Sequence, residues 1–327
     1  MLDNPSRRLI LHAGPPKTGT TAVQEILAKS GDPSVFYPRV GLWHDGAHHN
    51  LVFNFYQDFA RPEVERQDPQ AMFAQIGAQA RASTGNIVIS SEAFGGRDVG
   101  AFLRALLPHF GGMRLETEIL LVCRDHFARA ASLYNQYVKD ETSAETREPG
   151  AVLIDNAEGY TYQRLIEQFQ ASGFPVRVMN YHPAQDFLPR FFERIGFAGA
   201  TEIKNERHNV SLSIKGLIAT LAANRVARSV ADRQRLFTAL MRDEVAFFAP
   251  SLFIFDAAAV AAARPVFERD RQYLEQNFGL ALPEIEAEPP CAFFLTPQMF
   301  EDIVAVTHDL GAEGEAIVDD ARRYLSV

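Results

Sequence analysis

A lysine, two glycines and several hydroxyl side chains lie close together near the start of the chain, in GPPKTGTT (residues 14–21). The apolar run at residues 9–11 precedes this stretch, and a segment with helical periodicity at residues 22–27 follows it. This order predicts a buried strand, a turn and a helix N-terminus, where backbone N–H groups and the helix dipole attract an anion. Lys17 would add a positive charge to such a site, and the threonines would add hydroxyl donors.

A second pair of residues with the chemistry to bind phosphate is Arg124 and Ser132. Arg124 ends the apolar run 118–124, and Ser132 lies eight residues later in a predicted helix. A guanidinium fork at a strand end and a hydroxyl two helical turns further on can hold one phosphate group. Asp125 would suit a magnesium site after an apolar strand, but Arg124 occupies the position expected for the metal-binding acid.

The order of residues in the first loop indicates which anion it binds. A nucleotide-triphosphate loop reads G-x-x-x-x-G-K-[ST], with lysine after the second glycine. Here Lys17 comes before Gly19. This order resembles the 5′-phosphosulfate loop of sulfotransferases, which use 3′-phosphoadenosine 5′-phosphosulfate (PAPS) as donor. Arg124 and Ser132 match the spacing of that family's 3′-phosphate motif, although His126 replaces its usual proline.

The resemblance implies a role for each matched residue. Lys17 would stabilise the charge that develops on the bridging oxygen, and Arg124 and Ser132 would bind the 3′-phosphate. Arg207 lies in a segment, residues 207–213, that is similar to one in bacterial sulfotransferases, and it would close over the cofactor. PAPS would be the co-substrate, and no metal is expected. The residues implied to hold the 5′-phosphosulfate are Pro16, Lys17, Thr18, Gly19, Thr20 and Thr21.

Three residues are candidates for the base that takes a proton from the acceptor. Glu92 ends the predicted strand 86–92, whose carboxyl end belongs to the edge of a parallel sheet where ligands bind. His48 and His49 are rivals, because an unperturbed imidazole suits proton transfer near neutral pH. Glu92 could instead cap the next helix or pair with Arg97. Some carbohydrate sulfotransferases use a glutamate in this part of the fold, so the resemblance favours a carbohydrate-like acceptor.

The periodicity of the whole chain predicts an α/β protein. Predicted strands at residues 9–11, 35–37, 86–92, 118–124 and 176–181 alternate with helices. With the resemblance, this order predicts a three-layer, P-loop NTPase-like parallel sheet flanked by helices at about residues 7–198. A helical part follows at about residues 205–327, and both belong to one sulfotransferase-like domain, residues 1–327. Within the helical part, Pro265 separates the predicted helices 257–263 and 265–278.

Composition excludes several classes of protein. The 327 residues carry a formal net charge of −9, which argues against a nucleic-acid-binding protein. With two cysteines there is no disulfide framework, and Cys123 is expected to be a small buried thiol. No apolar run reaches 18 residues and no signal peptide is evident, so the sequence predicts a soluble, cytoplasmic protein without a membrane span.

With this resemblance, the sequence predicts a PAPS-dependent sulfotransferase that acts on a hydroxyl or amine, and the resemblance favours a carbohydrate as the acceptor. The first alternative is a P-loop kinase or NTPase, which would bind ATP and magnesium. A second alternative is a non-catalytic nucleotide-binding protein with the same fold. The identity of the acceptor and the oligomeric state are not encoded in any motif that we recognise.

Overall fold

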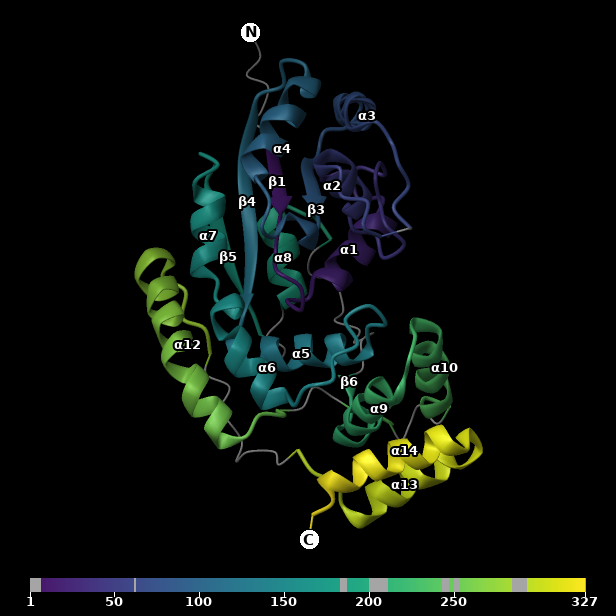
Figure 1. Ribbon diagram of the computed structural model, residues 1–327. Coiled ribbons are helices and arrows are strands. Elements are labelled where there is room, and N and C mark those ends of the chain that lie inside the picture. The colour runs from purple at the N-terminus through teal and green to yellow at the C-terminus, as the bar shows by residue number, and fades with distance from the viewer. Residues whose placement is uncertain are drawn as a thin grey trace. The chain divides into compact units, whose positions relative to one another are not determined.

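The computed structural model describes residues 7–61, 63–182, 187–199, 211–242, 247–249, 253–283 and 293–326. The chain forms two compact units (Figure 1). The first contains residues 1–124, 162–206 and 270–283, and the second contains residues 125–161, 207–269 and 284–327. Residues 125–161 therefore group with the C-terminal helices, although they lie between two strands of the sheet in sequence.

The first unit is built on a five-stranded parallel sheet with the strand order β2-β3-β1-β4-β5. The five strands predicted from the sequence are confirmed. In the register of the sheet, His12 at the end of β1 lies beside Ser90 at the end of β3. The loop after β1 and the residues after β3 therefore leave the sheet side by side. The strands are β1 (Arg7–His12), β2 (Val35–Phe36), β3 (Asn86–Ser90), β4 (Leu115–Arg124) and β5 (Val176–Tyr181).

Helices cover both faces of this sheet, because successive strand residues point to opposite sides. Leu9 and Leu11 of β1 pack into one apolar core, and Ile10 packs into the core on the other face. The first core is closed by α2 (His49–Tyr56), α3 (Pro69–Arg81), α4 (Val99–Leu106) and α7 (Gln163–Gln170), and the second by α1 (Thr20–Lys29) and α8 (Phe187–Ile195). Short 3-10 turns are η1 (Glu92–Phe94) and η2 (Leu107–Phe110). The predicted α/β class is confirmed.

The second unit consists mainly of helices around α9 (Ile214–Val226). Ten of the residues of α9 are buried, from Lys215 to Asn224, so this helix is enclosed by its neighbours on every side. A small antiparallel pair joins β6 (Ser211–Leu212) to β7 (Phe248–Ala249). The other elements are α5 (His126–Lys139), α6 (Pro149–Asn156), η3 (Ala157–Tyr160), α10 (Val230–Leu240), α13 (Pro297–Thr307), η5 (His308–Leu310), α14 (Ala312–Ala321) and η6 (Arg322–Tyr324).

The predicted break at Pro265 is wrong, because α12 runs without interruption from Ala257 to Phe278. Proline inside a helix removes one N–H donor and crowds the preceding turn, at a cost of about 3 kcal/mol. Burial on both sides of the proline offsets that cost. Phe267 packs in the core of the second unit, and Leu274 packs in the core of the first.

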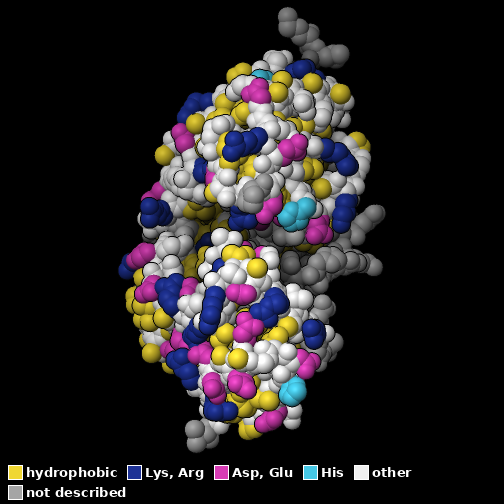
Figure 2. Space-filling model, turned by 45° about the vertical axis from the view of Figure 1, so that its right-hand side comes forward, with side chains coloured by type: hydrophobic (Ala, Val, Ile, Leu, Met, Phe, Trp, Pro, Cys, Tyr) yellow, Lys and Arg dark blue, Asp and Glu magenta, His cyan; other side chains and the backbone are white. Residues whose placement is uncertain are grey.

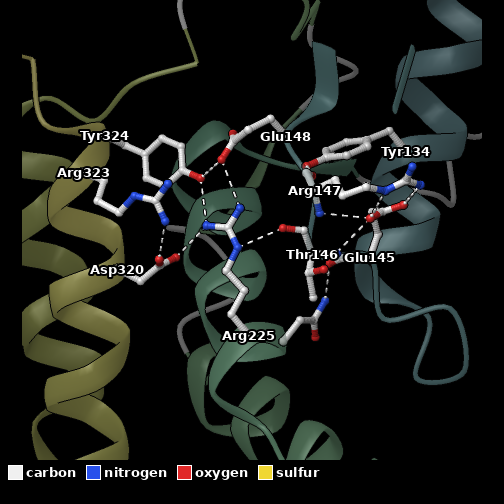
Figure 3. A network of polar contacts seen from close by, with 10 residues as sticks. Tyr134, Glu145, Thr146, Arg147, Glu148, Arg225, Asp320, Arg323 and Tyr324 are labelled. Carbon is white, nitrogen blue, oxygen red and sulfur yellow. Dashed lines mark hydrogen bonds and ion pairs between the residues drawn. The ribbon is translucent and has the colours of Figure 1, made fainter. Parts of the chain in front are cut away.

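A polar network centred on Arg225 holds the segment between α5 and α6 in the second unit (Figure 3). Nε of Arg225 donates to the carbonyl of Thr146 at 2.8 Å, and Nη2 lies 3.0 Å from Oε1 of Glu148. Nη1 donates to Oδ2 of Asp320 at 2.7 Å and to the hydroxyl of Tyr324 at 2.9 Å. Burial raises the pKa of Tyr324 to about 12, and its hydrogen bond with Glu148 acts in the same direction.

Charge is mixed on the face of the molecule that Figure 2 shows. On the face in Figure 2, basic and acidic side chains are interspersed and do not gather by sign. An anion must therefore be bound by local groups, since the formal net charge of the chain is −9. None of the helices within the described ranges is long and apolar enough to cross a membrane.

Candidate functional site

The loop after β1 adopts a backbone that few sequences can follow. Lys17 has φ of 71° and Gly19 has φ of 82°, so both lie in the left-handed region. A Cβ atom at Gly19 would lie 2.8 Å from Cε2 of Tyr181 and 2.9 Å from Cε1 of Phe187, so no side chain fits there. Unlike glycine, lysine disfavours a positive φ, so the backbone conformation of Lys17 costs roughly 1–2 kcal/mol. The surrounding structure holds Lys17 in this strained position.

The helix that follows the loop begins without a side-chain cap. Gly19 occupies the N-cap position of α1, and no acidic residue lies in the first turn. The first-turn N–H groups of a helix have no intrahelical partner, so they suit an anion. The hydroxyl of Thr18 donates to the carbonyl of Pro15 at 2.8 Å, which uses this side chain inside the turn. Thr18 and Thr20 are buried, whereas Pro16, Lys17 and Thr21 are half-buried.

Arg124 reaches the loop from the neighbouring strand end. Its Nη1 donates to the carbonyl of Lys17 at 3.1 Å, and its guanidinium lies 5.3 Å from the ring centroid of Tyr181. The hydroxyl of Tyr162 accepts from the backbone N–H of Arg124 at 2.8 Å and donates to its carbonyl at 2.7 Å. Oδ2 of Asp270 in turn accepts from the N–H of Tyr162 at 2.8 Å. No local pattern indicates Tyr162 or Asp270, because both are distant in sequence from Arg124 and from the loop after β1.

Ser132 belongs to α5 in the second unit, where it is half-buried among buried neighbours on the same helix. Asp125, considered above as a magnesium ligand, caps this helix by accepting from the N–H of Ala128 at 2.9 Å. Arg207 lies outside the described residues.

Glu92 is the second residue after β3, at the start of η1, and lies beside α1. Its Oε2 accepts from Nε2 of Gln24 at 3.0 Å and lies 3.5 Å from Nε2 of His49. Both contacts involve Oε2, so Oε1 has no protein partner in the described part of the chain. The two structural roles considered for Glu92 are taken by others. Asp98 caps the next helix, α4, by accepting from the N–H of Ala101 at 2.9 Å, and Arg97 is ion-paired with Asp58.

The two adjacent histidines have different environments. Both ring nitrogens of His48 contact the backbone, with Nε2 2.8 Å from the carbonyl of Pro38 and Nδ1 3.2 Å from the N–H of Ser90. Burial lowers the pKa of His48 to about 4. His49 is half-buried, and its Nδ1 lies 2.7 Å from Oγ of Ser91. Its Nε2 lies 4.0 Å from Asp45 as well as near Glu92, so the structure brings Glu92 and His49 together.

A buried hydrogen-bonded chain connects the loop side of β1 to Glu92. Nδ1 of His12 lies 2.8 Å from Oγ of Ser90, and Nε2 of Gln24 lies 3.1 Å from the same oxygen. Burial lowers the pKa of His12 to about 4, and the negative charge of Glu92 acts in the opposite direction. We did not single out His12 or Gln24 from the sequence. The available signal was a histidine that ends an apolar strand directly before the glycine loop.

Three histidines that could bind a metal ion, His44, His48 and His49, lie within six residues of the sequence. Across the ranges described above, no cluster of three or more His, Cys, Asp or Glu side chains is arranged to hold a metal ion.

No protein-family model matches the chain, and no curated protein matches it.

Proposed function

We propose that this protein is a sulfotransferase that transfers a sulfuryl group from PAPS to a hydroxyl or amine. One observation carries the proposal: three adjacent strand ends bring together a loop with an uncapped helix N-terminus, a guanidinium and a carboxylate. The β1 loop contributes Lys17, β4 contributes Arg124, which bonds to the carbonyl of Lys17, and β3 leads to Glu92, which bonds to α1. The carboxyl edge of a parallel α/β sheet is a common binding site for nucleotide phosphates.

The donor side of the reaction needs fixed positive groups. The transferred sulfuryl group carries charge on its oxygens, as a phosphoryl group does, so positioning and electrostatic stabilisation can supply most of the catalysis. In this proposal the first-turn N–H groups of α1 hold the 5′-phosphosulfate together with residues 16–21. Lys17 stabilises the bridging oxygen as its bond to sulfur breaks. Arg124 holds the 3′-phosphate, and Ser132 and Arg207 keep only the cofactor-binding roles that the resemblance implies.

The acceptor side needs a base. The acceptor oxygen or nitrogen attacks sulfur, its proton passes to the base, and adenosine 3′,5′-bisphosphate leaves. We assign the base to Oε1 of Glu92, because Gln24 and His49 hold the other carboxylate oxygen. His49 acts through Glu92 as a positioning residue. His48 receives no role in proton transfer, because both of its ring nitrogens contact the backbone.

The decisive experiment is ligand binding followed by turnover. Adenosine 3′,5′-bisphosphate without added metal should stabilise the protein by about 2.7 kcal/mol at 100 times its dissociation constant, measured as a thermal shift. Turnover should then be seen with PAPS and a panel of sugar, phenol and amine acceptors. A shift with ATP and magnesium, but none with the bisphosphate, would instead establish the kinase or NTPase function.

Variants of the two carboxylates extend this test to the base. Glu92→Gln should lower turnover roughly 10²-fold or more and leave bisphosphate affinity nearly unchanged. Asp45→Asn is the matched control. Like Glu92, Asp45 lies near Nε2 of His49, but among the described residues it has no contact with the loop at residues 14–21. Near-normal turnover of Glu92→Gln, together with a collapse in His49→Ala, would transfer the role of base to the histidine.

A further inference from the structure

A buried nitrogen of His12 points to a contact with the ligand of the loop. The side chain is almost completely enclosed, with the residue 1% exposed. Its Nε2 is buried and has no hydrogen-bond partner among the described residues. A buried polar group without a partner costs about 1–3 kcal/mol, so such groups in native proteins nearly always have one.

The position of this nitrogen is defined by Gly14. A Cβ atom built on Gly14 would lie 3.2 Å from Nε2 of His12, 3.6 Å from Oγ1 of Thr18 and 3.6 Å from Cγ2 of Thr20. Nε2 therefore lies against the inner side of the loop, next to the first residue of α1. Glycine leaves the space in front of the nitrogen open.

Two hydrogen-bond arrangements around Ser90 differ in whether Nε2 of His12 carries a proton. The carboxylate of Glu92 can only accept, so the amide nitrogen of Gln24 must face it. The same nitrogen donates its second proton to Oγ of Ser90. The hydroxyl proton of Ser90 then goes either to Nδ1 of His12, 2.8 Å away, or to the hydroxyl oxygen of Tyr37, which itself donates to the carbonyl of Gly46 at 2.7 Å. A neutral imidazole that accepts at Nδ1 carries its proton on Nε2.

We propose that His12 is an anion-binding residue whose Nε2–H donates to an oxygen of the tetrahedral phosphate or sulfate group held by the β1 loop. His12 would add a neutral donor beside the positive charge of Lys17. The chain through Ser90 and Gln24 would keep that donor in the correct tautomer and connect it to Glu92. The identity of the anion as the 5′-phosphosulfate of PAPS rests on the proposed function, whereas the donor role does not.

The tautomer can be measured directly in the full-length protein. With ¹⁵N-labelled histidine, long-range ¹H–¹⁵N spectra at pH 7 should show His12 with a protonated Nε2 and an unprotonated Nδ1. Inorganic phosphate, inorganic sulfate and adenosine 3′,5′-bisphosphate should each shift the Nε2 resonance on binding. If Ser90 instead donates to Tyr37, Nε2 would be unprotonated, and that spectrum would overturn the proposal.

Variants test the contact by affinity. His12→Phe keeps a ring of similar shape without the donor, and it should weaken bisphosphate binding about tenfold or more. His12→Gln places an amide donor near the position of Nε2 and should recover most of the affinity. Gly14→Ala leaves His12 intact but fills the space before Nε2, and it should also weaken binding.

The outcomes separate this inference from the proposed function. Unchanged affinity in both His12→Phe and Gly14→Ala would reject the donor role of His12. If His12→Phe does not fold, the spectra of the wild-type protein and the affinity of Gly14→Ala still test the donor role of His12. A shift of Nε2 with inorganic phosphate or sulfate, but no binding of the bisphosphate, would support the anion contact and reject the sulfotransferase.

Discussion

Three histidines near the carboxyl edge of the sheet illustrate how little residue type alone determines. His48 is fully engaged by the backbone, with one ring nitrogen donating and the other accepting. His49 is half-buried and lies between two carboxylates. His12 is buried with one nitrogen bonded to Ser90 and the other without a described partner. The sequence suggested His48 and His49 equally as bases, because spacing along the chain carries no information about burial.

The pH dependence of stability should reflect the two buried histidines. Burial lowers the pKa of His12 and of His48 to about 4, below the value near 6.5 of an unfolded chain. Between about pH 6.5 and 4 the unfolded state binds more protons, so stability falls as the pH falls. Each histidine should contribute about 1.4 kcal/mol per pH unit in this window, measured by denaturant unfolding at several pH values.

Substitution of His48 isolates its share of that slope. His48→Asn should be less stable than the wild type at pH 7, because two backbone contacts are altered. Its stability should nevertheless decline less steeply towards pH 4. His308→Asn is the control, since that side chain is 85% exposed and the slope should be retained. An unaltered slope in His48→Asn would show that His48 does not contribute through its protonation.

At the scale of elements, the predictions from sequence succeeded where a pattern was local. All five strands were found because apolar runs bounded by turns carry the signal themselves. The continuous α12 was missed, because Phe267 and Leu274, which stabilise it on both sides of Pro265, act through distant packing. The loop at residues 14–21 was predicted from its own residues. Tyr162 and Asp270, which hold Arg124 in place through hydrogen bonds, are distant in sequence and come close only in the folded chain.

The Arg225 network should be a main source of order in the second unit. Arg225 connects α9 to the segment before α6 and to the C-terminal elements, with a side chain that is 21% exposed. Its removal would leave Glu148 with only the hydroxyl of Tyr324, and Asp320 with only the guanidinium of Arg323, among the contacts of Figure 3. We expect Arg225→Gln to lower the free energy of unfolding by about 2 kcal/mol, and the midpoint of thermal unfolding by roughly 3 °C for a chain of 327 residues.

Arg235 offers a matched control for this change. It also forms an ion pair, with Glu313 at 2.7 Å, but its side chain is 49% exposed. Exposed ion pairs contribute little, so Arg235→Gln should cost less than about 1 kcal/mol. Equal losses in the two variants would mean that the network of Figure 3 adds nothing beyond an ordinary surface pair.

At the scale of the whole molecule, the two units are interleaved along the chain. The first unit draws its last segment from residues 270–283, far from its sheet in sequence. Asp270 accepts from the N–H groups of Tyr162 and Gln163, both at 2.8 Å, and Leu274 is fully buried in the core behind the sheet. The packing of the first unit therefore depends on residues that follow most of the second unit in the sequence.

Truncation should reveal this dependence. A chain that ends after Arg269 lacks Asp270 and Leu274, and its first unit should lose fixed tertiary packing. A chain that ends after Pro283 retains all segments of the first unit. Trp43, the single tryptophan, lies in the first unit and reports on it by fluorescence. We expect a red-shifted emission for the shorter chain alone; native emission from both would contradict this dependence.

The interleaved order has a consequence during translation. At about 5–20 residues per second, residue 283 leaves the ribosome roughly 10–30 s after residue 124. For that interval β1, β3 and β4 exist without the segment that completes their core, and apolar side chains such as Leu121 lack part of their cover. The nascent chain should therefore need a chaperone during this time, which crosslinking of arrested nascent chains can detect. Proteins whose sheet is finished within one uninterrupted segment leave the ribosome with no such delay.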